Sequence, residues 1–275
     1  MSTPTPRPAR PQTVLSVVRT EWVTPQLVRV IAGGPEFANL GLNEFTDKYS
    51  KLVFVKPELG IEPPYDVPAL RETLAQDDWP VVRTYTIRRV DVANEQLAID
   101  FVVHGTEGVA GPWAASAQPG DPVVLAGIGG AYAPADDTDW HVFVGDESAL
   151  PAISSALEVL PADAAGVAYL EVHDDSDVQL LAVPDNVLVN WIVRGDDDRR
   201  PETLAEAVLA GVWPDDARVQ VFAHGERESM KAVRAALAAR GIPRANFSLS
   251  GYWAHGRTED KFQAEKREPI GKIAD

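Results

Sequence analysis

The sequence predicts a β-barrel plus α/β fold: an antiparallel barrel followed by a domain with a parallel sheet. In the first half of the 275-residue chain, short runs of Val, Ile, Phe and Tyr alternate with Gly- and Pro-containing turns, a pattern typical of an antiparallel barrel. In the second half, strand-sized apolar runs alternate with helical stretches, which indicates βαβ units. The acidic stretch 134–139 (PADDTD) separates the two patterns and predicts the boundary between the domains.

The barrel is expected over residues 13–135, after a Pro-rich disordered lead-in over residues 1–12. Turn signals such as GGP at 33–35 and PGD at 119–121 separate its strands. A Pro-containing insertion between residues 57 and 80 is expected to form a loop with a short helix. The six expected strands cover residues 14–23, 27–31, 51–55, 83–90, 97–103 and 122–125.

The α/β domain is expected over residues 139–256, followed by a tail over 257–275 that contains one short helix at 258–267. Its strands are expected at residues 140–144, 166–172, 187–193, 218–223 and 246–252. Its helices are expected at residues 148–160, 201–209 and 226–240.

Composition excludes several classes of site. The chain has no cysteine, which removes thiolate metal sites, disulfides and cysteine nucleophiles, and its five histidines form no metal-ligand pattern. A net charge of −16 disfavours nucleic acid and anionic membranes, because both present phosphate charge. No apolar run approaches the roughly 18 residues of a membrane helix, and the first dozen residues have no apolar core of a secretory signal. We therefore expect a cytoplasmic monomer without membrane insertion.

The first motif is the strand segment RTYTIR at residues 83–88. Strand alternation puts Arg83, Tyr85 and Ile87 on one face and Thr84, Thr86 and Arg88 on the other. A guanidinium offers a planar fork to a phosphate, a tyrosine ring offers a flat surface to an aromatic ligand, and a threonine hydroxyl can bond a ring nitrogen or carbonyl. An ordinary strand with charged residues facing outward has the same pattern.

The second motif is DFVVHGTEGVAGPWA at residues 100–114, which indicates a strand, a glycine-rich turn and a helix. Pro112 is well placed in a first helical turn. Free backbone N–H groups at such a helix start attract an anion, notably a pyrophosphate. A capped turn that binds nothing is the alternative.

Together and in this order, the two motifs resemble the siderophore-interacting protein family, which comprises FAD-dependent ferric-siderophore reductases of the ferredoxin-reductase-like superfamily. The family pattern continues with Trp113-Ala114 and PGD at 119–121, then with GDESALPAI at 145–153 and GYW at 251–253. The resemblance covers the chain from about residue 14 to residue 256. It implies a barrel that binds FAD and a second, nucleotide-binding-like domain of the ferredoxin reductase-like type.

The resemblance also assigns roles. Arg83 would meet the FAD phosphates, Tyr85 would pack on the isoalloxazine, and Thr86 would bond near its N5; Tyr85 and Thr86 are the catalytic candidates. His104 and the turn over 108–113 would hold the pyrophosphate and ribityl region, although Val109 and Gly111 replace the family's usual Pro and Ser. The expected FAD-binding set is Arg83, Thr84, Tyr85, Thr86, Asp100, Val102, His104, Gly108, Val109, Ala110, Gly111 and Trp113.

NADH or NADPH is the electron donor expected as co-substrate. Ligands of a parallel sheet lie outside the carboxyl ends of its strands, where Gly145, Asp146, Glu147 and Ser148 begin a helix. We expect these residues to contact the dinucleotide, with Asp146 and Glu147 as helix caps. The loop RGDDDRR at 194–200 offers both signs of charge, and its three aspartates favour NADH. Ferredoxin, an alternative donor in this family, is disfavoured by charge, since both proteins would be acidic.

The expected substrate is a ferric siderophore. Many ferric siderophores are anionic, so the pocket needs cations. The candidates are Lys48, Lys51, Arg257 and Lys261. The family's usual arginine after GYW is replaced by Ala254. Two alternatives remain open: a siderophore-binding protein or iron chaperone without turnover, and a related reductase whose acceptor is another protein or a free flavin.

Overall fold

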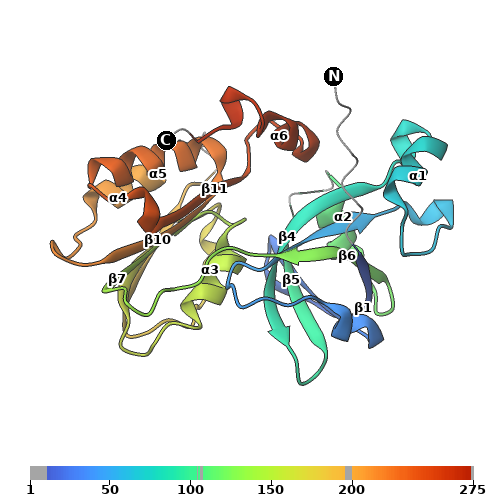
Figure 1. The fold of residues 1–275 in the computed structure, drawn as a ribbon, viewed down its shortest axis with the longest axis horizontal. Coiled ribbons are helices and arrows are strands. Elements are labelled where there is room, and N and C mark those ends of the chain that lie inside the picture. Colours follow the sequence, from blue (N-terminus) through green and yellow to red (C-terminus); the bar gives the residue numbers. More distant parts are fainter. Residues whose placement is uncertain (1–10, 104, 106–107, 196–199, 274–275) are drawn as a thin grey trace, which may run out of the picture. The chain divides into compact units, whose positions relative to one another are not determined.

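The computed structural model describes residues 11–103, 105, 108–195 and 200–273, and the chain divides into two compact units (Figure 1). The first unit comprises residues 1–21, 28–43 and 48–130, and the second comprises residues 22–27, 44–47 and 131–275. The short segment 44–47 belongs to the second unit because of its hydrogen bonds. The Asp47 carboxylate accepts the N–H groups of Ala131 and Tyr132 at 2.8 and 2.9 Å.

The first unit is built on a closed barrel with the strand order β1-β2-β5-β4-β3-β6, which confirms the predicted antiparallel barrel. Inward-facing residues alternate along its strands and fill the interior with apolar side chains, among them the fully buried Leu52, Ile87 and Phe101. The strands are β1 (Gln12–Thr24), β2 (Leu27–Gly33), β3 (Tyr49–Phe54), β4 (Val81–Asp91), β5 (Gln96–Val102) and β6 (Pro122–Gly129).

Several barrel strands extend beyond the expected ranges, and for β3 and β6 the reason is their pairing with each other. β3 begins at Tyr49, two residues early, and β6 continues to Gly129, because these two ends pair with each other. Ser50 is fully buried there, and its Oγ donates to the carbonyl oxygen of Gly127 at 2.8 Å. The pairing was missed because the glycine-rich end of β6 has low intrinsic strand propensity.

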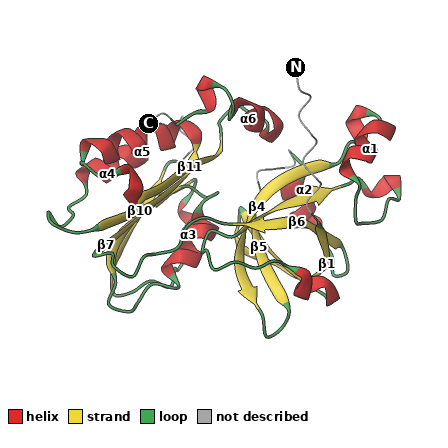
Figure 2. Ribbon diagram, in the orientation of Figure 1, coloured by secondary structure: helices red, strands yellow, loops and turns green. Residues whose placement is uncertain are grey.

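In the described part of the first unit, two short α-helices, α1 and α2, accompany the barrel (Figure 2). The insertion between β3 and β4 contains α1 (Val67–Thr73), as predicted, with the Asp66 carboxylate accepting the Ala69 N–H as its N-cap. Helix α2 (Ala110–Ser116) follows β5 and buries Ala110 and Ala114 in the barrel core.

The second unit contains the predicted parallel sheet, whose five strands have the order β11-β10-β7-β8-β9. Helices cover both of its faces. One face packs against α4 and α5 through Leu204, Val208 and Val233; the other packs against α3 through Ile153 and Leu157. The elements are β7 (Trp140–Gly145), α3 (Leu150–Leu157), β8 (Ala165–Val172), β9 (Asn186–Val193), α4 (Thr203–Ala210), β10 (Val219–Glu226), α5 (Arg227–Ala239), β11 (Phe247–Trp253) and α6 (Glu259–Glu265).

Helix α6 is fastened to this unit by Phe262, whose side chain is 1% exposed. Among the described residues, no helix combines the length and the apolar character that a membrane crossing requires. The predicted lead-in falls mostly on residues 1–10, which lie outside the described residues.

Candidate functional site

The motif at residues 83–88 lies in β4 and has the predicted alternation. Ile87 is buried in the barrel core and the Tyr85 ring packs against the same core, so both side chains lie on one face of β4. Arg83, two residues before Tyr85, is half-buried, and its Nη1 donates to the carbonyl oxygen of Val82 at 2.9 Å. Strand alternation thus places Arg83 and Tyr85 on the same face of β4, two residues apart.

The Tyr85 ring is one of three half-buried members of an aromatic cluster that we define as Phe54, Tyr85, Phe101 and Trp113. Its centroid lies 4.4 Å from that of Phe101, which has no solvent exposure. Trp113, on α2, contacts Phe101 at 5.5 Å and Phe54 at 5.4 Å between centroids. Contacts between aromatic rings add stabilisation beyond that of the area they bury. The cluster therefore favours one orientation of the Tyr85 ring.

The opposite face of β4 carries the two threonines of the motif. Thr84 is exposed, whereas Thr86 is buried and lies opposite Tyr49 of β3 in the strand register. The Tyr49 ring lies against Gly129, where an added Cβ would overlap the ring. Thr86 is thus held in a tightly packed part of the barrel.

Asp100, on β5, is committed to an ion pair inside the first unit. Its carboxylate accepts Arg29 Nε at 2.6 Å and Nη2 at 2.8 Å, and its side chain is almost fully buried. A bidentate pair of this kind positions both partners. The Asp100 carboxylate therefore anchors β5 to β2, so a contact of Asp100 with a cofactor would come through its backbone.

Two glycines, Gly108 and Gly111, lie where the chain enters α2. Gly108 has φ +82°, and a Cβ built on it would meet nothing within 4 Å. At Gly111 a Cβ would lie 3.0 Å from the carbonyl oxygen of Val102, so glycine lets α2 approach β5 closely. The first-turn N–H groups of Ala110 and Gly111 have no acceptor within the helix. His104, also expected here, lies outside the described residues.

These residues fit a flavin dinucleotide. Its ring system needs a flat apolar partner and its phosphates need cations or N–H donors. The barrel provides a Tyr85 ring backed by the aromatic cluster, the Arg83 guanidinium on the same strand face, and an open turn at Gly108. Val102, Val109 and Trp113 border the same turn.

In the second unit, Asp146 follows β7 and is 2% exposed. Its Oδ1 accepts the N–H and the hydroxyl of Ser148, and its Oδ2 accepts Glu226 N–H and Trp253 Nε1, both at 2.8 Å. Asp146 is not the side-chain cap of α3, contrary to the prediction: the N-cap is Ala149, without a side-chain hydrogen bond, and the Asp146 carboxylate instead binds Ser148 in the turn before the helix. Gly145 is required by packing, because a Cβ there would lie 2.8 Å from Ala149 Cβ and Ile153 Cδ1.

Glu147 is not a helix cap, contrary to the prediction. Its carboxylate lies 2.7 Å from Arg194 Nη2, and Arg194 Nη1 lies 3.3 Å from Glu171 at the end of β8. All three side chains are at most 13% exposed. The pKa of Arg194 is raised: burial opposes this, but the hydrogen bond that Arg194 donates to Glu147 and the charge of both carboxylates outweigh it. The aspartates expected to favour NADH, Asp196 to Asp198, lie outside the described residues.

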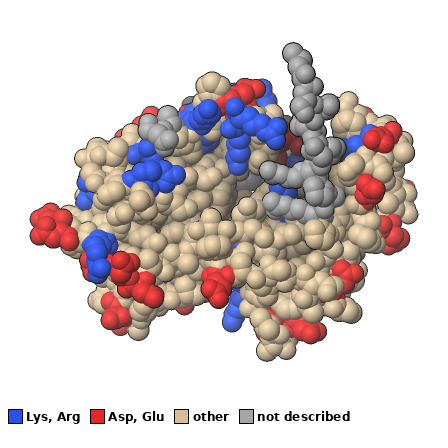
Figure 3. All heavy atoms as spheres, in the orientation of Figure 1, with Lys and Arg blue, Asp and Glu red and all other residues tan. Residues whose placement is uncertain are grey.

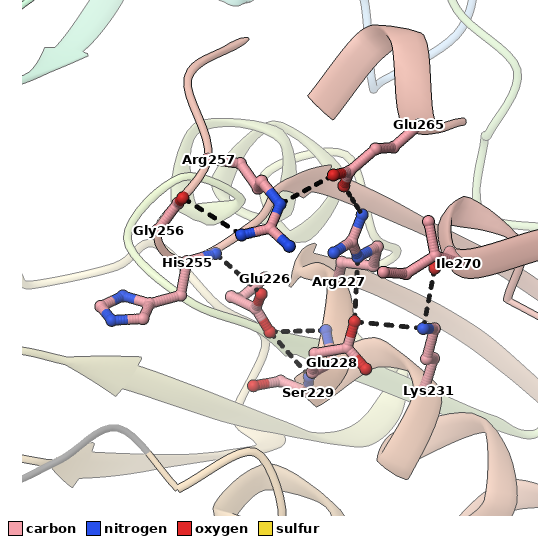
Figure 4. Close-up of polar contacts among 10 residues, drawn as sticks. All are labelled: Glu226, Arg227, Glu228, Ser229, Lys231, His255, Gly256, Arg257, Glu265 and Ile270. Carbon is pink, nitrogen blue, oxygen red and sulfur yellow. Dashed lines mark hydrogen bonds and ion pairs between the residues drawn. The ribbon is translucent and has the colours of Figure 1, made fainter. Parts of the chain in front are cut away.

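Glu226, at the end of β10, is the N-cap of α5 (Figure 4). It is 2% exposed, and its Oε2 accepts the N–H groups of Glu228 and Ser229. Its Oε1 accepts the N–H of His255 at 3.0 Å. One carboxylate thereby ties the segment after β11 to the start of α5.

Arg257, a predicted substrate contact, is bound by the chain itself (Figure 4). Its Nε donates to Glu265 Oε1 at 2.7 Å, while Arg227 Nη1 donates to Glu265 Oε2 at 2.6 Å. The pKa of Glu265 is lowered, chiefly by the Arg227 hydrogen bond. The Arg257 guanidinium therefore fastens α6 to the second unit, and a ligand would have to share it with Glu265.

The remaining predicted cations differ in environment. Lys51 on β3 and Lys261 on α6 are exposed, and their ammonium groups have no ion pair with any described residue. Lys48 is half-buried. In the view of Figure 3, Lys and Arg side chains gather over α5 and α6, whereas acidic side chains are scattered over the face.

Sequence patterns did not indicate three of these partners. Arg29 meets Asp100 across 71 positions, Trp253 meets Asp146 across 107, and Glu265 meets Arg227 across 38. The GYW motif pointed to Trp253, but only the fold identifies what its indole nitrogen binds. Among the described residues, no group of acidic and histidine side chains forms a metal site.

Comparison with known proteins matches both units to one family. Residues 16–132 match the siderophore-interacting FAD-binding domain, and residues 138–256 match the siderophore-interacting protein model. The chain has the fold of a ferredoxin NADP+ reductase from Neisseria gonorrhoeae, at 13% identity and a TM-score of 0.58, over 88% of this chain and 98% of that one. This likeness concerns the fold alone.

Several relatives are similar over almost their whole length. An uncharacterized protein of Mycobacterium tuberculosis is 44% identical over 94% of this chain and 96% of its own. The ferric vibriobactin reductase ViuB of Vibrio cholerae is 33% identical over 92% of this chain and 93% of its own. A siderophore utilization protein from T. fusca is 35% identical, with a TM-score of 0.74 over 90% of this chain and 94% of that one. The resemblance inferred from the motifs is confirmed: the chain belongs to the siderophore-interacting protein family, with residues 16–132 as its FAD-binding domain.

Proposed function

We propose that this protein reduces ferric siderophores, taking electrons from NADH or NADPH through FAD. The observation that carries the proposal is the face of β4, where half-buried Arg83 precedes by two residues a Tyr85 ring that packs in the aromatic cluster. The match of residues 16–132 to the FAD-binding domain and the similarity to ViuB, a ferric vibriobactin reductase, support it.

In this proposal the chain supplies binding and orientation. FAD, when bound, supplies the exchange between a two-electron donor and one-electron acceptors. Tyr85 gives the flavin ring a flat partner, Arg83 binds the phosphates, and the turn at Gly108 offers backbone N–H groups to the pyrophosphate. Thr86 is the candidate for a hydrogen bond to the ring system.

The acceptor is Fe(III) held by a chelator with hard oxygen ligands. One NAD(P)H gives up two electrons, so two Fe(III) ions are reduced while one proton is released. Fe(II) binds hard oxygen ligands less tightly than Fe(III) does, so reduction releases the metal. Cations favour an anionic ferric chelate, and exposed Lys51 and Lys261 are the candidates among the described residues.

Anaerobic mixing tests the proposal. The flavin-loaded protein should lose its yellow absorbance on addition of NADH or NADPH and regain it when a ferric siderophore is added, with Fe(II) trapped by a chromogenic chelator. A preparation that binds ferric siderophore but neither bleaches nor forms Fe(II) would contradict reduction and favour a binding protein. Bleaching by reduced ferredoxin alone would contradict the nicotinamide donor.

Lys51→Ala should raise KM for anionic ferric chelates by about threefold and leave KM for neutral chelates unchanged, because an exposed charge pair contributes roughly 0.2–1 kcal/mol. The matched control is Lys56→Ala, at a lysine just after the same strand whose Nζ is bound to Asp78 at 2.8 Å. Equal KM values of Lys51→Ala and the wild type on both chelate classes would remove Lys51 from the substrate site.

A further inference from the structure

The second unit has a topological switch point between β7 and β10. From β7 the chain continues to β8 and β9 on one side, and then returns to β10 and β11 on the other. Ligands of parallel α/β sheets bind outside the carboxyl ends of the strands at such a point. Here those ends are Gly145-Asp146 after β7 and Gly225-Glu226 in β10.

The hydrogen-bond donors at this point converge on one side chain of the protein itself. Four donors from three places in the chain bind the Asp146 carboxylate: the N–H and hydroxyl of Ser148, the N–H of Glu226 and the indole nitrogen of Trp253. The N–H groups of Ala149 and Leu150, which lead into α3, donate to the Asp146 carbonyl oxygen at 2.9 and 3.2 Å. These six donors are therefore occupied within the chain.

Gly225, near the end of β10, lies close to the same Asp146 carboxylate. Gly225 has φ +154°, and a Cβ built on it would lie 2.9 Å from Asp146 Oδ2. In dinucleotide sites a glycine lets the backbone approach the pyrophosphate. In this chain the anion that the backbone of Gly225 approaches is the carboxylate of Asp146.

Charge at this edge also opposes a second anion. Asp146, Glu171 and Glu226 are each 2% exposed, so their charges are weakly screened by solvent. The nearby cation Arg194 is already bound to Glu147 and Glu171. A pyrophosphate entering here would meet carboxylates and no available donor among these groups.

We propose that Asp146 is a specificity-determining residue: its carboxylate occupies the anion position at the β7–β10 switch point and weakens the binding of a dinucleotide's pyrophosphate. The inference rests on the proposed function in that NADH or NADPH is the donor. It implies that the wild-type protein binds the nicotinamide donor with low affinity. It also implies that removal of the Asp146 carboxylate makes the anion position available to the pyrophosphate.

The test compares the flavin-loaded wild type with Asp146→Ser and Asp146→Asn. Inorganic pyrophosphate is titrated calorimetrically, and the NADH concentration that half-maximally bleaches the flavin is measured anaerobically. Asp146→Ser should bind pyrophosphate saturably and lower that NADH concentration by about tenfold or more, since like charges in contact cost at least that factor in affinity. Asp146→Asn should give a smaller gain, because it removes the charge but keeps the side chain in place.

The control is Asp163→Asn, which removes the same charge at an exposed position of the same unit and should behave as the wild type. Circular dichroism verifies folding, and Asp146→Asn decides the matter if the serine variant does not fold. Wild-type binding of pyrophosphate as tight as that of the variants, or folded variants without a gain, would overturn the inference. Calorimetry measures pyrophosphate binding without any turnover. If NADH bleaches none of the forms, that result counts against the proposed donor, while the calorimetric titrations still decide the role of Asp146.

Discussion

Purified Arg83→Ala protein is expected to carry about tenfold less FAD than the wild type, or to bind added FAD more weakly by that factor. A charge-assisted hydrogen bond contributes roughly 1.5–3 kcal/mol, which corresponds to a factor of ten or more in the dissociation constant. Arg83 is only half-buried and is not part of the barrel core, so its removal should leave that core intact. The ratio of flavin to protein absorbance and a fluorescence titration with FAD measure the effect.

Arg89→Ala is the matched control for this experiment. Arg89 lies on the same strand, β4, and is exposed, so loss of its charge should not change FAD occupancy. Normal flavin content in Arg83→Ala would rule out the assigned phosphate contact. An equal loss in both variants would show that the effect comes from the net charge of the strand rather than from one contact.

The second large effect is a loss of stability in acid caused by His224. This side chain stacks on Phe222 at 4.0 Å between centroids, and its Nε2 lies 3.0 Å from the hydroxyl of Ser248. Its Nδ1 is buried and has no hydrogen-bond partner among the described residues. Burial lowers the pKa of His224 to about 3, with a smaller contribution from the positive charge of Lys266.

The sign of the pH effect follows from this pKa. In the unfolded chain a histidine takes up a proton below about pH 6.5, whereas folded His224 stays neutral down to about pH 3. Between these values the unfolded state binds more protons, so the contribution of His224 to stability is present above pH ~6.5 and is lost as the pH falls. The loss is about 1.4 kcal/mol per pH unit, or roughly 2 kcal/mol at pH 5.

Urea unfolding at pH 7.5 and pH 5 measures this loss, and His224→Gln should reduce it by roughly 2 kcal/mol. The pKa of His141 is also lowered by burial, so part of the acid sensitivity should remain in the variant. His255→Gln, at an exposed histidine, is the control and should match the wild type. An unchanged difference between the two pH values in His224→Gln would show that His224 is protonated in the folded protein.

Local patterns were sufficient to predict most of the fold. The barrel strands and the βαβ units follow from residue periodicity and turn residues, which act over a few positions. The ends of elements were less predictable. β6 reaches Gly129 because its glycine-rich end pairs with Tyr49 and Ser50, and α3 begins at Leu150 because Asp146 closes a turn before it.

The motifs likewise identified the family and placed candidate residues in the right elements, but they did not predict what each side chain binds. Asp146 was expected to cap a helix and instead binds Ser148 in the turn before α3 and accepts donors from β10 and β11. Glu147 was likewise expected to cap the helix and pairs with Arg194. Arg257 was expected to face a ligand and is bound by Glu265.

The sequence by itself thus determined the fold class, the family and the strand face that presents Arg83 and Tyr85. Only the tertiary structure decided the partners of the buried charges: Arg29 for Asp100, Arg227 for Glu265, and the donors that surround Asp146. The physical reason is distance along the chain. Periodicity and turn chemistry depend on neighbouring residues, whereas these buried carboxylates bind donors that the folded chain brings to them. Apart from Ser148, these donors lie 38 to 107 positions away.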